Sequence, residues 1–183
     1  MDLDDIKYSR ETAISAVTDF YRFLTRMYLN ESHVIYPPAG GWPAIVNADP
    51  AALQCLGKSD EALALMAHLP YVSNETAEIS PGSTVAHWAD EIADLAPGHL
   101  GRGEDLRVFT EGMLAKILPS HVLGLVQSRD QAVVLDTELG IIHREDWPHE
   151  LNWGNDACRA RVDWDRDDEV SPEENDWRHD APA

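Results

Sequence analysis

The sequence has few cysteines, no long apolar run and few basic residues. Only Cys55 and Cys158 occur, far apart and outside any CxxC pair, which excludes a disulfide scaffold or zinc ribbon and favours a reducing compartment. No stretch approaches the roughly eighteen consecutive apolar residues of a membrane-spanning helix. The acidic segment 1–5 also lacks the positive start of a signal peptide. We therefore expect a soluble protein in the cytoplasm or nucleus.

The scarcity of basic residues gives the chain a strong negative charge. Lysine and arginine total 14 against 33 aspartates and glutamates, a net charge of −19. This charge repels phosphate backbones and anionic headgroups, so we expect neither nucleic acid nor a membrane as a partner. Two roles for the charge stay open: it maintains solubility, or it attracts a basic protein partner.

The common catalytic and nucleotide-binding motifs are also absent. No serine lies in a G-x-S-x-G turn, and neither cysteine lies in an active-site signature. The glycines of the segment 97–105 do not fit G-x-G-x-x-G, and no phosphate-binding loop with its lysine occurs. We therefore expect no cofactor, and the sequence leaves open whether the protein is an enzyme.

What the chain does have is a pattern typical of one α+β domain over residues 1–155. Its 183 residues, 44% hydrophobic, are enough for one core. Apolar residues at spacings of three and four predict helices at 9–29, 85–95 and 104–118. Asp49-Pro50 and Ser59 predict the starts of two short helices, the second ending at Pro70.

The spacing of apolar residues changes to that of β-strands after Pro119. Short β-branched or aliphatic runs at 122–126, 132–135 and 140–143 are separated by connections of about four residues, which indicates an antiparallel meander. Helices followed by a meander predict several helices packed on a small antiparallel sheet.

The last residues, 156–183, are predicted to be a disordered acidic tail. Between residues 163 and 180 the sequence contains nine acidic residues against two arginines. Such a segment cannot bury enough apolar surface to offset the entropy of ordering it.

Three segments carry a resemblance to a known group of proteins. GGWP at 40–43, LGKSDEALALMAHLPY at 56–71 and VVLDTELGIIHR at 133–144 resemble, in this order, an uncharacterised family of small fungal proteins with GWP, LGK, HLPY and LDTE-x-G segments. The hairpin at 133–144 is also distantly similar to that of SMI1/KNR4-type domains, which act largely as interaction modules. The resemblance implies an interaction role and supplies no catalytic residue.

Aromatic and histidine residues in the central segments are the candidate site residues. Trp42, in the rigid proline-rich segment 36–43, is either an anchor of the core or an exposed binding residue. The candidate binding residues are Trp42, Tyr71 and Trp88, and the candidate catalytic residues are His68, His87 and Asp90. Each histidine also has a structural interpretation: His68 can satisfy carbonyls at a helix end, and His87 with Asp90 is also what an acidic amphipathic helix gives by chance. A metal could recruit His143, His149 and Glu150, although Pro148 favours a solvated loop there.

Two functional hypotheses follow. The first is a non-catalytic protein-interaction module whose acidic tail engages a basic partner. The alternative is a small enzyme or small-molecule-binding protein, whose pocket under the helices is lined by the aromatic residues and served by the histidines or Asp90.

Overall fold

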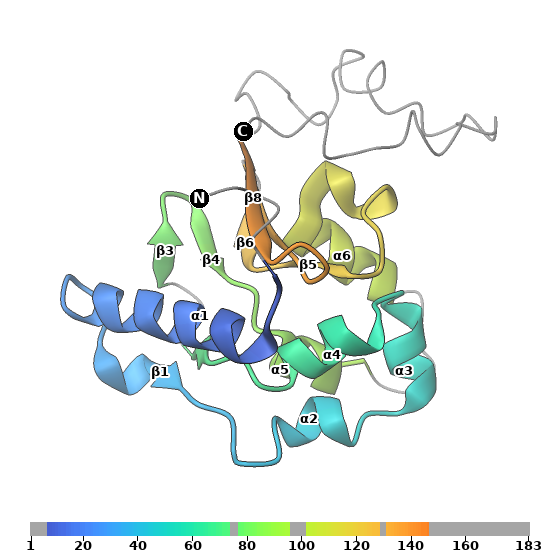
Figure 1. The fold of residues 1–183 in the computed structure, drawn as a ribbon, viewed down its shortest axis with the longest axis horizontal. Helices are drawn as coiled ribbons and strands as arrows, with labels where there is room; N and C mark the ends of the chain where they lie inside the picture. The colour runs from blue at the N-terminus through green and yellow to red at the C-terminus, as the bar shows by residue number, and fades with distance from the viewer. Residues whose placement is uncertain (1–6, 74–76, 96–101, 129–130, 147–183) are drawn as a thin grey trace.

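The computed structural model describes residues 7–73, 77–95, 102–128 and 131–146, and it has the α+β architecture expected from the sequence (Figure 1). The segment 156–183, predicted to be an acidic tail, lies outside the described residues, as do His149 and Glu150. The α-helices are α1 (Arg10–Thr25), α2 (Pro43–Val46), α3 (Pro50–Cys55), α4 (Asp60–Met66), α5 (Trp88–Ala93) and α6 (Arg102–Glu111). Two 3₁₀ turns, η2 (Glu31–His33) and η3 (Gly112–Lys116), complete the helical part.

Three of the helices begin at the capping residues predicted from the sequence. The side chain of Ser9 accepts a hydrogen bond from the Thr12 amide at 3.3 Å and caps α1. Asp49 caps α3 and Ser59 caps α4 in the same way. Each cap satisfies a backbone N–H that has no partner inside its own helix, and so fixes where the helix starts.

Several of the expected helices are shorter than predicted, and one is added. The helix expected at 9–29 ends at Thr25, and the one expected to reach Pro70 ends at Met66. The helix expected at 104–118 ends at Glu111, because Gly112 has a positive φ of 59° and starts the tighter turn η3. The helix expected from Val85 begins at Trp88, since Val85 belongs to a strand. At the end of the proline-rich segment 36–43, Pro43 occupies the first turn of the added helix α2, where its missing N–H costs nothing.

Within the described residues, the strands form three small antiparallel sheets with the orders β1-β2, β3-β4-β6 and β5-β7-β8. Their bounds are β1 Val34–Ile35, β2 Tyr71–Val72, β3 Glu78–Ser80, β4 Ser83–Val85, β5 Val122–Gly124, β6 Val126–Ser128, β7 Gln131–Asp136 and β8 Ile141–Asp146. The run 122–126 expected as one strand is divided at Leu125, whose amide donates to the carbonyl of Val133. Its first half therefore pairs with β7 and its second half with β4.

The main core lies where the helices meet the sheets. It gathers Leu24 of α1, Leu65 of α4, Trp88 of α5 and Leu123 of β5, each at most 4% exposed. In Figure 1, α1 (blue) lies on one side of the strands and α6 (yellow-green) on the other. None of the helices in the described ranges is both long and apolar enough to cross a membrane.

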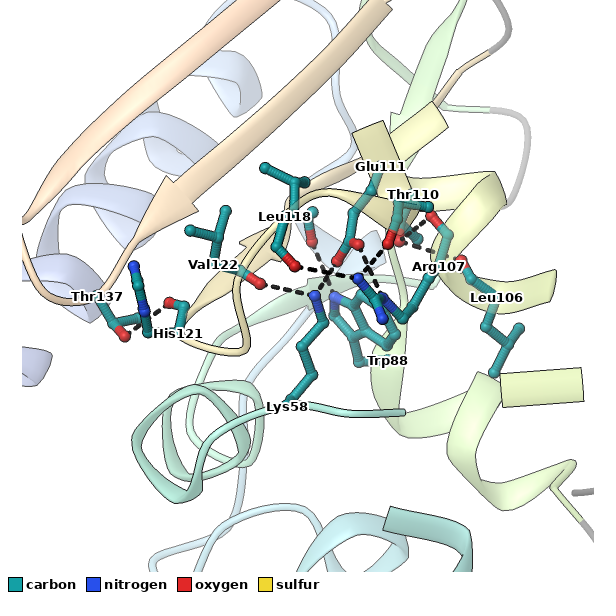
Figure 2. A network of polar contacts seen from close by, with 12 residues as sticks. Lys58, Trp88, Leu106, Arg107, Thr110, Glu111, Leu118, His121, Val122 and Thr137 are labelled. Atoms are coloured by element: carbon teal, nitrogen blue, oxygen red, sulfur yellow. Dashed lines mark hydrogen bonds and ion pairs between the residues drawn. The ribbon is translucent and has the colours of Figure 1, made fainter. Parts of the chain in front are cut away.

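A buried ion pair joins the helical part to the sheet. The Lys58 ammonium lies against Glu111 Oε1, and neither side chain is exposed to solvent. Lys58 Nζ also donates to the carbonyl of Val122 at 2.7 Å, and Figure 2 shows these groups pointing at one another. The contact thus connects the segment before α4 to the end of α6 and the start of β5.

Arg107 is the second basic residue that contacts the Glu111 carboxylate. Its Nε donates to Glu111 Oε2 at 3.1 Å, and its terminal nitrogen donates to the carbonyls of Ala115 and Leu118. Burial lowers the pKa of Lys58 from its usual range, while the neighbouring carboxylate opposes that change. An ammonium in such surroundings needs its counter-ion, because an unpaired buried charge is strongly destabilising.

Gly124 allows α6 to approach β5 closely. A Cβ at this position would lie 2.7 Å from the carbonyl carbon and from the Cβ of Thr110, closer than side chains normally come. The carbonyl of Gly124 also accepts a hydrogen bond of 2.9 Å from the indole of Trp88. The backbone at Gly124 therefore contacts α6 on one side and the buried tryptophan on the other.

A substitution at Gly124 tests this close contact. Gly124→Ala is expected to lower the free energy of unfolding by about 1–3 kcal/mol, because the new methyl group must push α6 away from β5. Urea denaturation followed by circular dichroism measures the change. Gly40→Ala is the matched control, since a Cβ at Gly40 meets no atom within 4 Å. Equal stability of the two variants would show that α6 and β5 are not packed as described.

Removing the counter-ion of Lys58 tests the buried ion pair. Glu111→Ala is expected to lower the free energy of unfolding by about 3–5 kcal/mol, because Lys58 is left buried without an anion. The double variant Lys58→Met with Glu111→Met is expected to recover part of this loss, since no buried ammonium remains and the partly exposed Arg107 keeps its bonds to the carbonyls of Ala115 and Leu118.

The exposed pair of Arg22 and Asp19 provides the control for this experiment. Their side chains are 63% and 66% exposed at a separation of 3.2 Å. Asp19→Ala is therefore expected to change stability by less than about 1 kcal/mol. A similar small change for Glu111→Ala would contradict the buried position of the pair.

Candidate functional site: an apolar cavity beneath the first helix

Polar contacts at both of its ends hold α1 over the sheets. At its start, Glu61 of α4 accepts hydrogen bonds from the Tyr8 hydroxyl at 2.8 Å and from Arg10 at 2.9 and 2.5 Å. The hydrogen bond from Arg10 holds the pKa of Glu61 below its usual range, and burial raises that of Tyr8. Beyond the other end of α1, the Tyr28 hydroxyl donates to the carbonyl of Glu78 in β3. The helix is thus attached to α4 at one end and to the sheet at the other.

Between these attachments the side chains of α1 leave a cavity of about 410 Å³. Ala13, Ala16 and Val17 are short residues that face it from the middle of the helix. The opposite wall comes from β3, β4, β6, β7, β8 and the loop before β2. Protein interiors rarely contain voids much larger than a water molecule, so a space of this size is a candidate ligand site.

The floor of the cavity is formed by residues of the main core. Trp88 and Tyr71 are each 1% exposed and line it together with Leu125, Val133 and Leu135. Their polar atoms are already bonded within the protein: the Trp88 indole donates to Gly124, and the Tyr71 hydroxyl donates to the carbonyl of Met66 at 2.6 Å. The floor therefore offers mainly apolar surface to a ligand.

The mouth of the cavity lies along the exposed side of α1. Phe20 is 44% exposed and Ile142 of β8 is 56% exposed, and both line the cavity. Lys7, Thr12 and Ala16 are exposed members of the same lining. A molecule could thus enter from solvent between α1 and β8, past large apolar side chains.

Two of the three candidate binding residues line this cavity. Tyr71 and Trp88 do so, whereas Trp42 packs against the outer side of Tyr71 with ring centroids 5.7 Å apart. The Trp42 indole donates to the carbonyl of Leu69 at 2.8 Å. Trp42 therefore supports the wall of the cavity and does not contact its interior.

The candidate catalytic residues lie outside the cavity lining. His68 Nδ1 is 2.8 Å from the carbonyl of Ala64 at the end of α4, and Asp90 is exposed. His87 stacks on Tyr71 with ring centroids 4.6 Å apart, and its Nδ1 is 3.3 Å from both the backbone nitrogen and a carboxylate oxygen of Asp90. In the part of the chain that the structure describes, His87 Nε2 is buried without a hydrogen-bond partner. None of these contacts joins His68 to His87.

No metal centre is formed by the residues that the structure describes. His143 lies in β8 opposite Val134, while His149 and Glu150 are beyond the described residues. Within ranges 7–73, 77–95, 102–128 and 131–146, no three histidine, cysteine, aspartate or glutamate residues are grouped as metal ligands would be. Among the described residues, none of these residue types lines the cavity.

Sequence reasoning missed the part of the cavity wall that α1 provides. Ala13, Val17 and Tyr21 recur every four residues, so they share one face of the helix. The pattern predicts a face packed on the core, but it does not show that the small residues leave space. Only the short side chains at positions 13 and 16 indicate in the sequence that this face of the helix leaves space for a cavity.

No protein-family model matches the chain, and no curated protein or solved structure is significantly similar to it. The resemblance to small fungal proteins with GWP, LGK, HLPY and LDTE-x-G segments therefore stays a prediction.

Proposed function

We propose that the protein binds a small, largely apolar molecule in the cavity beneath α1. The cavity itself carries this proposal: its volume of about 410 Å³ falls within the range of ordinary ligand pockets, roughly 300–1,000 Å³. Its walls are aromatic and aliphatic, and its mouth has the exposed side chains of Phe20 and Ile142. Burying an apolar molecule there would remove both the ligand and these side chains from water.

The residues of the lining favour binding over catalysis. General acid–base chemistry needs a titratable group within hydrogen-bond reach of the substrate. His68, His87 and Asp90 are not in the lining, and Lys7 is exposed at its edge. Burial raises the pKa of the lining residues Tyr8 and Tyr21, which makes their phenols poor proton donors and keeps them from acting as bases. We therefore propose a carrier or sensor of an apolar molecule as the function, rather than an enzyme.

Filling the cavity tests this function. Ala13→Phe places a ring in the space between α1 and the floor and is expected to weaken binding of the neutral dye Nile red at least tenfold. Titration of dye fluorescence measures the dissociation constant. The protein should keep its stability, because the ring occupies existing space and does not displace packed groups.

Ser15→Phe is the control for this variant, because Ser15 is an exposed residue of α1 outside the cavity lining. It adds the same ring to the same helix and should leave dye binding unchanged. Binding that is equal in both variants, or absent from the wild-type protein, would overturn the proposed function.

We also propose a second function, the engagement of a basic protein partner by the acidic segment at the end of the chain. The charge supports it: the net charge is −19, and residues 163–180 hold nine acidic residues against two arginines. Opposite charges on two proteins speed their association and strengthen it at low ionic strength. This role does not involve the cavity, so one protein can have both.

Salt dependence and truncation together test the second function. Proteins captured by the full chain at low salt should be largely lost when salt is raised to about 0.5 M, since screening weakens exposed charge pairs. The variant lacking residues 163–183 should capture none of them. Binding that resists salt and survives the truncation would contradict a role for this segment.

A further inference from the structure

The hydroxyl of Tyr21 is the one unusual polar group of the cavity wall. Tyr21 lines the cavity, and its side chain is only 5% exposed. Within the described residues this hydroxyl makes no hydrogen bond, in contrast to those of Tyr8 and Tyr71. Burial raises the pKa of Tyr21, so the phenol is neutral and can both donate and accept. This hydroxyl is not among the fully buried polar atoms that lack a partner, so it keeps accessible surface through which a group from outside the protein can reach it.

The position of Tyr21 on α1 separates it from Lys7, the charged residue of the described lining. Lys7 precedes α1, and the backbone of Tyr21 lies about 16 Å along the helix from its first residue, Arg10, at a rise of about 1.5 Å per residue. The residues between them on the helix face are Ala13 and Val17. A ligand that reaches Tyr21 therefore lies mostly against apolar walls.

We propose that Tyr21 recognises a neutral oxygen, a hydroxyl or carbonyl group, carried by an otherwise apolar ligand. This inference rests on the proposed function and specifies its ligand class. A hydrocarbon that covered this hydroxyl would remove it from water without giving it a partner, while an alcohol or ketone would satisfy it. A carboxylate at this position would be desolvated with no cation beside it, because the described lining has no basic residue except Lys7. The favoured ligand is therefore a neutral molecule such as a long-chain alcohol or ketone.

Competition with Nile red distinguishes these ligands. Dodecanol and 2-dodecanone are expected to displace the dye from the wild-type protein at about twofold to tenfold lower concentration than dodecane. This factor is the gain in affinity that one net hydrogen bond provides. Dodecanoate at neutral pH is expected to be weaker than dodecanol. The same competition is then repeated with Tyr21→Phe, which keeps the ring and removes only the hydroxyl.

Tyr21→Phe should bind dodecane as the wild-type protein does and lose the preference for the oxygenated ligands. Tyr36→Phe is the matched control, because Tyr36 is 52% exposed and outside the lining; it should keep the preference. Equal binding of dodecanol and dodecane by the wild-type protein, or an unchanged preference in Tyr21→Phe, would overturn the role of Tyr21. Failure of the dye and of all four competitors to bind would instead overturn the proposed function.

The stability of the free Tyr21→Phe protein gives a second readout. Removing a hydroxyl that has no partner among the described residues should leave the melting temperature unchanged or raise it, because no hydrogen bond of the folded protein is lost. A clearly lower melting temperature would show that the hydroxyl already has a structural partner, and would also overturn the inference.

Discussion

A lysine buried away from water must keep its counter-ion, and this requirement fixes how the helical part of the protein meets the sheet. Lys58 lies between α3 and α4, Glu111 ends α6, and the carbonyl of Val122 begins β5. These groups come from distant parts of the chain, yet none of them can move far without leaving a charge unpaired in the interior. The position of β5 relative to α4 and α6 depends on this contact (Figure 2).

The same constraint extends to the cavity. β5 ends at Gly124, whose carbonyl holds the indole of Trp88, and Trp88 forms part of the cavity floor. α1 covers this floor, with polar contacts to Glu61 and Glu78 near its two ends and with Leu24 packed into the main core. The floor is held in place by these contacts, and the residues in the middle of α1 are too small to reach it. A cavity therefore remains between the helix and the floor. Such a site suits binding, since the walls are largely formed before any ligand arrives.

The sequence was informative wherever a local interaction decides the structure. Ser9, Asp49 and Ser59 start their helices as predicted because a capping side chain acts within two or three residues. The α+β class also followed from the change in apolar spacing. The hairpin of β3 and β4 was missed, because its strands are only three residues long and carry little pattern.

The site could not be predicted to the same extent, because it depends on contacts between distant residues. Lys58 and Glu111 are 53 positions apart, and nothing in the sequence around either residue identifies the other as its partner. The aromatic candidates Tyr71 and Trp88 do lie at the cavity, since large buried rings commonly form pocket walls. The spacing of three residues between His87 and Asp90 does bring their side chains together, but it does not show whether the pair faces the cavity.

The central claim is that an apolar cavity between α1 and the sheets receives a small molecule. Crystals of the unliganded protein placed under xenon gas test it most directly, because xenon enters apolar cavities and is readily located by its scattering. The account predicts a xenon atom between Val17 of α1 and the indole of Trp88. Side chains that fill this space, or xenon bound elsewhere and absent from it, would contradict the account.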